Sequence, residues 1–340
     1  MSKKETIILG IESSCDDTSA SVLKNDTVLS NEVAGQSVHE EWGGIVPELA
    51  SRAHQQNIVP VVDLAIKKAG ITKADIDAIA FTRGPGLMGS LLVGTSFAKS
   101  LALCLAIPLV EVNHMQAHVL AHFINDAKQT VPHFPFLCLT VSGGHTQLVL
   151  VRDFLTMEVV GTTIDDAAGE AFDKTAKLLG FSYPGGPFID QYAQKGNPAA
   201  FTFTKPQVPA FNFSFSGLKT NVIQFIQKNE RKETDFVKNN LYDICASLQR
   251  TIISILLEKL TAAAKQYKVD EVAIAGGVSA NSGLRTSIQE LGAKNNWKVH
   301  IPKFEYCTDN AAMIAIAGRH NYLAGNFAKQ TVTPNARLKM

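Results

Sequence analysis

The sequence predicts an α/β protein built from two similar halves, and three observations support this fold class. Short apolar, β-prone segments alternate with longer segments of helical periodicity along the 340 residues. The order strand, turn, strand, strand, helix, strand begins at Ile7 and begins again at Phe136. The length itself is that of about two domains. We therefore expect two α/β halves facing a cleft, where small ligands tend to bind.

The first half is expected to hold the following elements: strands at 7–11, 19–23 and 28–33, a helix at 47–70, a strand at 76–81, a helix at 89–106, a strand at 109–112 and a helix at 114–123. Pro60 lies inside the helical stretch that ends near Gly70, and it predicts a break or a kink there. Asn113 is placed to cap the helix that follows it.

The second half is expected to hold these elements: two strands joined by a glycine turn within 136–151, a strand at 157–163, a helix at 165–180, loops at 183–215, helices at 218–227 and 236–267, a strand at 271–275, a helix at 278–291, a strand at 298–302 and a final helix near 309–324. We place the boundary near 127–133. This divides the chain into an N-terminal lobe, residues 1–130, and a C-terminal lobe, residues 131–340, with the final helix closing a metal site between the lobes.

Composition and charge narrow the functional classes. The chain has 32 basic and 31 acidic residues, a net charge of +1, so any nucleic-acid surface must be a local basic patch. Five widely spaced cysteines without a CxxC pair predict reduced thiols and a cytoplasmic setting. The longest apolar stretch, 90–110, is interrupted by Lys99 and Pro108, so we expect no membrane span and no signal peptide.

The segment NHMQAH, residues 113–118, contains the metal candidates. His114 and His118 are four apart, which puts both rings on one helical face. Met115 stands where the zinc-protease pattern HExxH has its glutamate. Asp309 is the best third ligand by chemistry, and such a set suits Fe(II) or zinc. The alternative is an ordinary helix with a histidine row that extends to His122, and a cap at Asp309.

Three glycine turns follow strands, at 84–90, 142–146 and 275–283. Glycine turns let backbone amides approach phosphate oxygens at a helix N-terminus. None matches a P-loop or a strict GxGxxG pattern. Two of them lie in the second half and end apolar strands, which predicts a nucleotide site. Asn281 would reach a ribose or an amide there, or would only cap its helix.

Acidic residues concentrate in TIDDAAGEAFDK, where Asp165 and Asp166 are explained as caps of the next helix. Asp173 lies two turns in, so with Asp190 it could bind ligand hydroxyls or order a water. The segment FNFSFSGLKT, 211–220, is an edge strand with a Ser216 cap, or a hydrophobic wall with Lys219 facing a substrate.

Taken together, the motifs resemble one family. IESSCDDTSASV, GGIVPELASRAH, GPGLMGSLLVG, NHMQAH, VSGGHTQL, IDDAAGEAFDKTAKLLG, YPGGP, FSFSGLKT, AGGVSANSGLR and CTDNAAMIA occur in this order between about 7 and 319. They are similar to the threonylcarbamoyl-transfer enzymes of tRNA, long labelled O-sialoglycoprotein endopeptidases, and closest to their bacterial and mitochondrial branch. The resemblance implies the actin and sugar-kinase fold, two RNase-H-like lobes around a nucleotide cleft.

The resemblance also implies an activity and a set of site residues. The family moves threonylcarbamoyl from threonylcarbamoyl-AMP to N6 of adenosine 37 in tRNAs reading ANN codons. Its metal ligands match His114, His118 and Asp309, with Fe(II) favoured over Zn(II), and Glu12 matches a further acid counted among the catalytic residues. Its substrate contacts match Thr140, Val141, Ser142, Gly143, Gly144, Asp173, Gly186, Asp190 and Asn281. Many bacterial members have Glu-Gly where this chain has Gln116-Ala117, which would alter the polarity around the ligands.

The implied partners are tRNA, a non-catalytic paralogue of similar fold, a small P-loop ATPase and a separate synthase that supplies the adenylate. The helical stretch after Pro47 is the expected contact surface. Two other functions stay open on the residues alone: a metallopeptidase using the same metal, and a small-molecule kinase of the same fold.

Overall fold

The computed structural model describes residues 5–35, 42–127 and 129–340, and the chain forms two compact units. Unit 1 comprises Met1–Val131, Arg152–Met157 and Pro302–Met340, and unit 2 comprises Pro132–Val151 and Glu158–Ile301. Unit 2 begins at Pro132, whereas the sequence places the boundary near 127–133 and assigns everything after it to the second lobe. The segment 302–340 belongs to unit 1 because its helix packs on the sheet of that unit.

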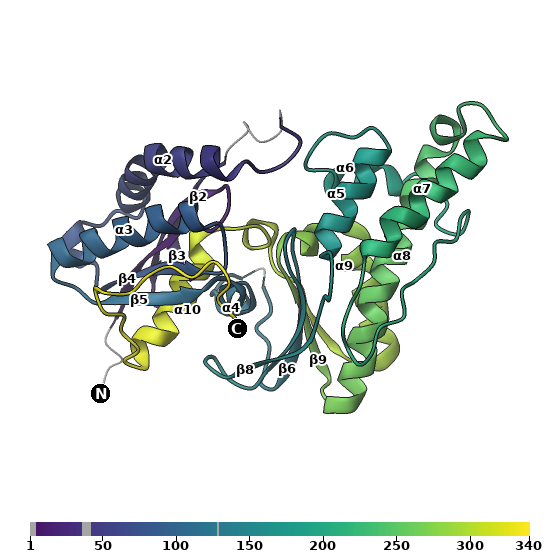
Figure 1. Ribbon diagram of the computed structural model, residues 1–340. Coiled ribbons are helices and arrows are strands. Elements are labelled where there is room, and N and C mark those ends of the chain that lie inside the picture. Colours follow the sequence, from purple (N-terminus) through teal and green to yellow (C-terminus); the bar gives the residue numbers. More distant parts are fainter. Residues whose placement is uncertain (1–4, 36–41, 128) are drawn as a thin grey trace. The chain divides into compact units, whose positions relative to one another are not determined.

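Unit 1 is built on a five-stranded sheet of order β3-β2-β1-β4-β5 (Figure 1). Its strands are β1 (Ile7–Glu12), β2 (Thr18–Lys24), β3 (Thr27–Ala34), β4 (Ala78–Gly84) and β5 (Leu109–Asn113). β1 pairs antiparallel with β2 and parallel with β4, and β4 pairs parallel with β5. The C-terminal ends of the parallel strands β1, β4 and β5 therefore lie on one side of the sheet. At this side β5 leads into α4 (His114–Leu120), the helix that carries the two histidines.

Helices cover both faces of this sheet. Alternation along β1 sends Leu9 to a cluster with α2 (Pro47–Lys68) and α3 (Met88–Leu105), and sends Ile8 to a cluster with α10 (Ala311–Leu323) and α4 (His114–Leu120). A 3₁₀ turn, η2 (Ala121–Phe123), continues α4, and another, η1 (Lys73–Asp75), precedes β4. Of the break or kink predicted at Pro60, the break does not occur, because α2 is a single 22-residue helix that continues through Pro60. Pro60 is exposed, where water can satisfy the carbonyl that loses its partner.

Gly10 lets α10 lie directly on β1. A Cβ atom built on Gly10 would come within 2.4 Å of the carbonyl oxygen of Ala311 and 2.8 Å of the amide nitrogen of Ala315. Both contacts are with backbone, which cannot move out of the way as a side-chain tip can. The first turn of α10, directly after Asp309, is held close to the sheet by this absence of a side chain.

We expect Gly10→Ala to destabilise unit 1 by about 2 kcal/mol or more, because the helix must shift to admit the methyl group. Urea unfolding followed by circular dichroism will measure the loss. Gly44→Ala is the matched control, since no atom lies within 4 Å of its Cβ position, although its positive φ adds some strain of its own. An unchanged midpoint for Gly10→Ala would contradict the close packing.

The apolar stretch at 90–110 divides into helix α3 and the start of strand β5. Among the described residues, α3 is the one helix with the length and apolar composition to cross a membrane, and a third of it, 33%, is buried. Pro108 lies beyond the helix end, so it does not interrupt it. Core helices of other proteins pass the same test, and here α3 packs against α2 and β4.

Unit 2 repeats the topology of unit 1. Its sheet has the order β10-β9-β6-β7-β8 and consists of β6 (Phe136–Val141), β7 (Thr146–Val151), β8 (Met157–Thr162), β9 (Glu271–Ala275) and β10 (Lys298–His300). β6 pairs antiparallel with β7 and parallel with β9, as β1 does with β2 and β4. The predicted two-fold structural repeat is thus confirmed by strand order and direction.

The helices of unit 2 share one apolar cluster with the inward side chains of β6, among them Leu137, Leu139 and Val141. They are α5 (Ala168–Leu178), α6 (Gly186–Ala193), α7 (Ser216–Glu230), α8 (Phe236–Tyr267) and α9 (Ser282–Asn295), with 3₁₀ turns η3 (Gly277–Ala280) in this unit and η4 (Phe304–Tyr306) in unit 1. The strand ends and helix starts of this unit carry the predicted ligand residues.

A buried carboxylate ties the start of the second sheet together. Glu271 at the start of β9 accepts from the backbone N–H of His133 at 2.8 Å, from Nζ of Lys298 at 2.9 Å and from Nε2 of His300 at 3.1 Å. Burial alone would raise the pKa of Glu271, but these donors more than offset it and lower the pKa to about 2. The ionised form is therefore favoured by folding.

Since the pKa of Glu271 is depressed in the folded protein, its contribution to stability is present above about pH 4.5 and is lost as the pH falls toward 2. We expect Glu271→Gln to destabilise unit 2 by about 3 kcal/mol at pH 7 and to reduce the acid-dependent loss of stability in that window. Denaturant titrations at a series of pH values will measure this. Glu290→Gln, on an exposed position of α9, is the control; equal pH profiles for the two variants would contradict the assignment.

The last residues, 326–340, form an extended segment along unit 1 that we call the C-terminal strap. The N–H of Ala328 donates to the carbonyl of Leu109 at 2.8 Å, and the N–H of Asn335 donates to the carbonyl of Arg83 at 2.8 Å. Gly84 is in a left-handed conformation, φ +153°, and a Cβ there would meet the carbonyl oxygen of Asn335 at 1.9 Å. The strap thus lies directly against the ends of β4 and β5.

Candidate metal centre and glycine-rich turns

The histidine helix begins where the sequence predicts. Asn113 ends β5, and its side-chain oxygen accepts from the N–H groups of Met115 and Gln116 at 2.9 and 3.2 Å, which caps α4. The cap fixes the first turn, so His114 and His118 project from one face of α4. Both side chains are buried, with 7% and 1% of their surface exposed.

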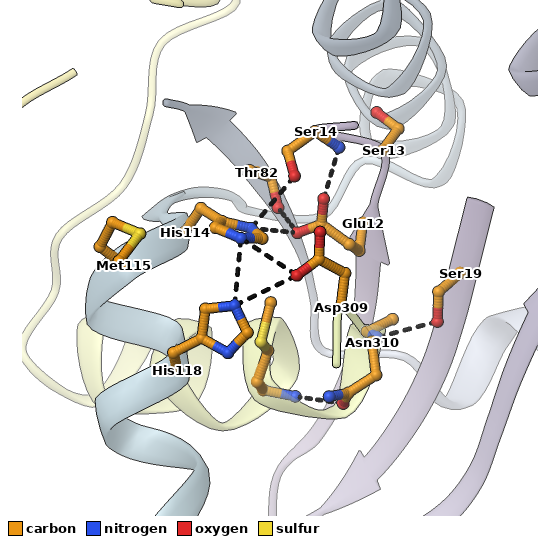
Figure 2. A network of polar contacts seen from close by, with 12 residues as sticks. Glu12, Ser13, Ser14, Ser19, Thr82, His114, Met115, His118, Asp309 and Asn310 are labelled. Atoms are coloured by element: carbon orange, nitrogen blue, oxygen red, sulfur yellow. Dashed lines mark hydrogen bonds and ion pairs between the residues drawn. The ribbon is translucent and has the colours of Figure 1, made fainter. Parts of the chain in front are cut away.

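Asp309 comes from the other end of the sequence. The residue that caps α10 is Asn310, which accepts from the N–H of Met313 at 3.1 Å. Asp309 is therefore not needed as a cap, and its carboxylate turns toward α4 (Figure 2). All of these residues belong to unit 1, so the centre lies within one unit rather than between the predicted lobes.

Three donor atoms converge at this place. Nε2 of His118 lies 3.2 Å from Nε2 of His114 and 3.2 Å from Oδ1 of Asp309, and Nε2 of His114 lies 3.3 Å from the same Oδ1 (Figure 2). They are the set of histidine and acidic side chains among the described residues whose donor atoms lie close enough together to hold an ion.

The triangle fits a metal ion. Ligands about 2.0–2.2 Å from a cation are roughly 3–3.5 Å from one another at octahedral to tetrahedral angles. The three observed separations fall in that range. Two neutral imidazole nitrogens facing each other with a carboxylate also need a cation or a proton between them to avoid repulsion. Donor type, spacing and burial thus agree with a two-histidine, one-carboxylate site.

Glu12 supports His114 from behind. It is fully buried at the end of β1, and Oε2 accepts from Nδ1 of His114 at 3.0 Å and from the hydroxyl of Thr82 at 2.6 Å (Figure 2). Its other oxygen accepts from the N–H of Ser14. Because an ionised carboxylate only accepts, it places the His114 proton on Nδ1 and leaves Nε2 free for a ligand.

The electrostatics of the site favour a positive charge. Burial lowers the pKa of His114, but the charges of Asp309 and Glu12 more than reverse this and raise its pKa well above the ordinary value. Burial would raise the pKa of Asp309 and of Glu12, yet His114 brings both pKa values down. Burial lowers the pKa of His118. A bound cation would replace the proton on His114, so metal binding would release a proton.

Sequence reasoning missed the groups that hold Glu12. Ser14 follows β1, two residues after Glu12, but Thr82 lies in β4, 70 residues away from Glu12, so no local pattern connects all three. It also passed over Asp17, whose pKa is raised to about 7, first by burial and then by the charges of Asp16 and Asp309. The acidic turn ESSCDDTS contained the signal, but residue types alone did not separate its members.

The predicted substrate residues all lie in unit 2, and the first group forms the turn between β6 and β7. The N–H of Ser142 donates to the carbonyl of His145 at 2.8 Å, which closes the turn. Gly143 and Gly144 are exposed, and their N–H groups donate no hydrogen bond within the described chain. Thr140 and Val141 are buried in the strand before the turn, so their side chains support it rather than line it.

Two further glycines bring neighbouring segments against this turn. A Cβ on Gly169, in α5, would meet the carbonyl oxygen of Ser142 at 2.5 Å. A Cβ on Gly276, after β9, would meet the carbonyl oxygen of Val141 at 2.5 Å, and Gly276 has φ +86°. The starts of α5 and η3 therefore lie beside the turn, as a phosphate-binding arrangement requires.

The remaining predicted residues link the helices next to the turn. Oδ1 of Asp173, in α5, accepts from the N–H groups of Gly185 and Gly186 at 2.8 and 3.1 Å. Asp190, in α6, accepts from the N–H and hydroxyl of Ser282 at 2.9 and 2.7 Å. Burial raises the pKa of Asp173. Both carboxylates thus serve the framework, and Oδ2 of Asp173 has no partner among the hydrogen bonds of the described chain.

Asn281 is the helix cap that the sequence allowed as its simpler role. Its side-chain oxygen accepts from the N–H of Leu284 at 2.9 Å, and its nitrogen donates to Gln249 at 2.8 Å.

Asp165 does not cap its own helix. It accepts from the N–H groups of Phe215 and Ser216 at 2.7 and 3.3 Å, so it caps α7. Phe215 is buried in the core and Lys219 is exposed, and Ser216 begins α7 rather than capping it.

Fold and site together define an α/β enzyme of the actin and sugar-kinase class. Solved structures support the fold: HypF in its phosphate- and nucleotide-bound form matches 94% of this chain and 47% of its own, with TM-score 0.61 and 13% identity. The activator of 2-hydroxyisocaproyl-CoA dehydratase from Clostridium difficile with bound ADPNP matches 94% of this chain and 96% of its own, with TM-score 0.51 and 14% identity.

The chain belongs to the TsaD family, the tRNA N6-adenosine threonylcarbamoyltransferases, whose sequence profile matches residues 27–316. Curated relatives with that name are 62% identical in Christiangramia forsetii, over 100% of both chains, and 59% identical in Riemerella anatipestifer, over 99% of both. The protein is therefore a transferase of a family that acts on tRNA. The metallopeptidase and the kinase, kept open on the residues alone, are not favoured.

Proposed function

We propose that the protein transfers threonylcarbamoyl from threonylcarbamoyl-AMP to N6 of adenosine 37 in tRNAs that read ANN codons, and releases AMP. The observation that carries the proposal is the buried triangle of His114, His118 and Asp309 within a transferase of this family. We propose that this triangle takes the polar acyl group and that the glycine turns of unit 2 take the phosphate.

We propose one divalent ion at the triangle, with Fe(II) favoured and Zn(II) the alternative, since both accept two imidazoles and a carboxylate. When bound, the ion supplies a Lewis acid that polarises a carbonyl oxygen. His114 and His118 offer Nε2, and Asp309 offers Oδ1. Glu12 holds the proton of His114 on Nδ1, which keeps the ligand nitrogen free and the ring fixed.

The turn at Ser142–Gly144 is proposed to hold the adenylate phosphate. The exposed N–H groups of Gly143 and Gly144 supply donors without the need for a cation. Oδ2 of Asp173 is proposed to accept from a ribose hydroxyl, while Oδ1 keeps the turn at Gly185 and Gly186 in place. Thr140, Val141, Asp190 and Asn281 are proposed to position these groups.

Direct transfer suits the acceptor. The exocyclic amine of adenine is a weak nucleophile because its lone pair is delocalised into the ring, but AMP is a good leaving group from a mixed anhydride. The C–N bond to the adenosine forms as the C–O bond to AMP breaks, and the amine loses one proton. Burial raises the pKa of the Cys15, Cys138 and Cys245 thiols, which argues against a thiolate intermediate.

The test combines the metal-loaded protein, its proposed partners, threonylcarbamoyl-AMP and unmodified tRNA. We expect threonylcarbamoyladenosine at position 37 by nucleoside mass spectrometry, and AMP in equal amount. His114→Ala is expected to abolish both products. A threonylcarbamoyl group trapped on the protein by rapid quenching would contradict direct transfer, and an unmodified tRNA with the wild-type protein would contradict the reaction.

We also propose that α2 and α3 form the surface for a paralogue of similar fold, and that a small P-loop ATPase and a separate synthase complete the cytoplasmic pathway. Exposed apolar residues on the two helices support this: Val59 and Leu64 on α2 and Leu92 and Leu103 on α3. Val59→Asp is expected to prevent co-elution with the purified paralogue, and Leu323→Asp, elsewhere in unit 1, is expected not to. Co-elution of both variants would contradict this surface.

A further inference from the structure

A hollow of about 520 Å³ lies between the C-terminal strap and the N-terminal end of α4, and the metal triangle does not use it. It is lined mainly by carboxamides, cations and one aromatic ring, including Gln116, Asn326, Phe327, Lys329 and Lys339. Its lining residues all belong to unit 1. The hollow is thus a complete feature of that unit, with a polar wall and a hydrophobic platform.

The strap side of the hollow offers unused recognition groups. Phe327 is 52% exposed and makes a T-shaped contact with Tyr322, at 5.7 Å between ring centroids, so about half of the residue's surface can meet a ligand. Nδ2 of Asn326 donates to Asn321 at 3.1 Å, which leaves its carbonyl oxygen available. The ring of Phe327 and the side-chain oxygen of Asn326 are therefore both available to a ligand in the hollow.

The α4 side offers a second amide. Gln116 is half-buried, its backbone N–H is used by the Asn113 cap, and its side-chain amide makes no hydrogen bond with the described residues. An amide can donate and accept at once, which matches the edge of a nucleobase. Gln116 lies two residues after His114 and points to the other side of α4. The hollow is therefore about one helix diameter, ~10 Å, from the metal triangle.

The charge in the hollow is positive. Arg83 pairs with Glu111 at 2.9 Å, so the one carboxylate on the wall is neutralised. Lys329 and Lys339 form no ion pair with the described residues and remain available for phosphate. The chain as a whole has a net charge of only +1, so a local concentration of cations beside an aromatic ring is informative.

We propose that this hollow binds an unstacked base of the tRNA anticodon loop next to the adenosine that reacts. The inference rests on the action of the family on tRNA. The base stacks on Phe327, its edge meets the amides of Gln116 and Asn326, and Lys329 contacts the adjacent phosphate. Single-stranded RNA is read in this way, by aromatic stacking and base-edge hydrogen bonds. The subsite positions the loop rather than taking part in the chemistry.

The first test measures binding of an anticodon stem-loop RNA by fluorescence anisotropy. We expect Phe327→Leu to weaken binding by about 5–100-fold, and Phe327→Tyr, which keeps a flat ring, to stay within about twofold of wild type. An RNA lacking the base on one side of the target adenosine is expected to bind wild type as weakly as intact RNA binds Phe327→Leu. Phe327→Leu should bind the RNA that lacks this base no more weakly than it binds the intact RNA. Equal binding by all variants, or the same Phe327→Leu loss on every RNA, would overturn the proposal.

The second test uses salt dependence. Lys329→Gln is expected to reduce the slope of log affinity against log salt by about one, because one phosphate contact is lost. Lys265→Gln, on an exposed position of α8 in unit 2, is the matched control and should leave the slope unchanged. Equal slopes for both variants would overturn the phosphate contact.

The design separates this inference from the proposed reaction. If Phe327→Leu modifies tRNA with unchanged KM, the base subsite is wrong and the reaction stands. If the wild-type protein binds the stem-loop through Phe327 but forms no modified nucleoside, the subsite stands and the reaction is wrong. Metal content of Phe327→Leu should equal wild type, which excludes an indirect effect through α4. If a purified partner protein binds at Phe327 and RNA does not, the hollow is a site for that protein and the proposal is wrong.

Discussion

Asp309→Asn is expected to remove the metal and at least about 100-fold of the transferase activity, with little change in the fold. The side chain keeps its shape, but the carboxylate that brings a negative charge within 3.3 Å of both ligand nitrogens becomes neutral. The pKa of His114, which Asp309 helps to raise, should fall as well. Elemental analysis of the purified protein and the tRNA modification assay will measure the two losses.

Asp153→Asn is the matched control, because Asp153 caps an exposed turn of the same unit through the N–H groups of Leu155 and Thr156, both at 2.8 Å. An asparagine can accept those bonds equally well. It should keep full metal content and activity. A fully metal-loaded Asp309→Asn protein would show that the triangle is not the metal site, and full activity without metal would show that the site is not catalytic.

Glu12→Gln is expected to lower metal affinity by about 10–100-fold, although Glu12 is not itself one of the converging donors. Its two carboxylate oxygens accept from Ser14, Thr82 and His114. A glutamine would turn an N–H₂ group toward one set of these donors. The ring of His114 would then lose the acceptor that fixes its proton on Nδ1. Competition with a chelator, followed by activity at saturating metal, will separate affinity from turnover.

The outcome depends on His114 being positioned by Glu12. If excess metal restores activity to Glu12→Gln, the residue acts by positioning the ligand, as we expect. If activity stays low at full metal occupancy, Glu12 has a direct part in the reaction. Unchanged metal affinity would contradict the role that its contact with His114 implies. Thr82→Val, which removes one donor to the same oxygen, is expected to show a smaller effect of the same kind.

Local patterns predicted the parts of the site that lie close in sequence. The spacing of His114 and His118 and the cap at Asn113 are properties of one helical turn, and both are as expected. The repeat of strand, turn and strand also follows from short segments, and the strand orders match it. Such features depend on backbone geometry within a few residues, which sequence alone specifies well.

Features set by tertiary packing were not predictable in the same way. Asp165 has the position of a cap for its own helix but caps α7, about 50 residues later, because folding places that helix start nearer. Periodicity shows that the final helix is apolar, but not which sheet it covers, so its place in unit 1 was missed. Gly10, which admits this helix, is recognisable only once its neighbours are known.

The return of the chain to unit 1 after residue 301 has a consequence for biosynthesis. His118 and Asp309 are 191 residues apart, and all of unit 2 is translated between them. The first 130 residues leave the ribosome lacking the helix that covers one face of their sheet. That face therefore stays uncovered until residues 302–340 emerge, and Asp309, the proposed third ligand, is absent until then. Chains truncated after residue 301 and released from the ribosome should be protease-sensitive in unit 1 and resistant in unit 2.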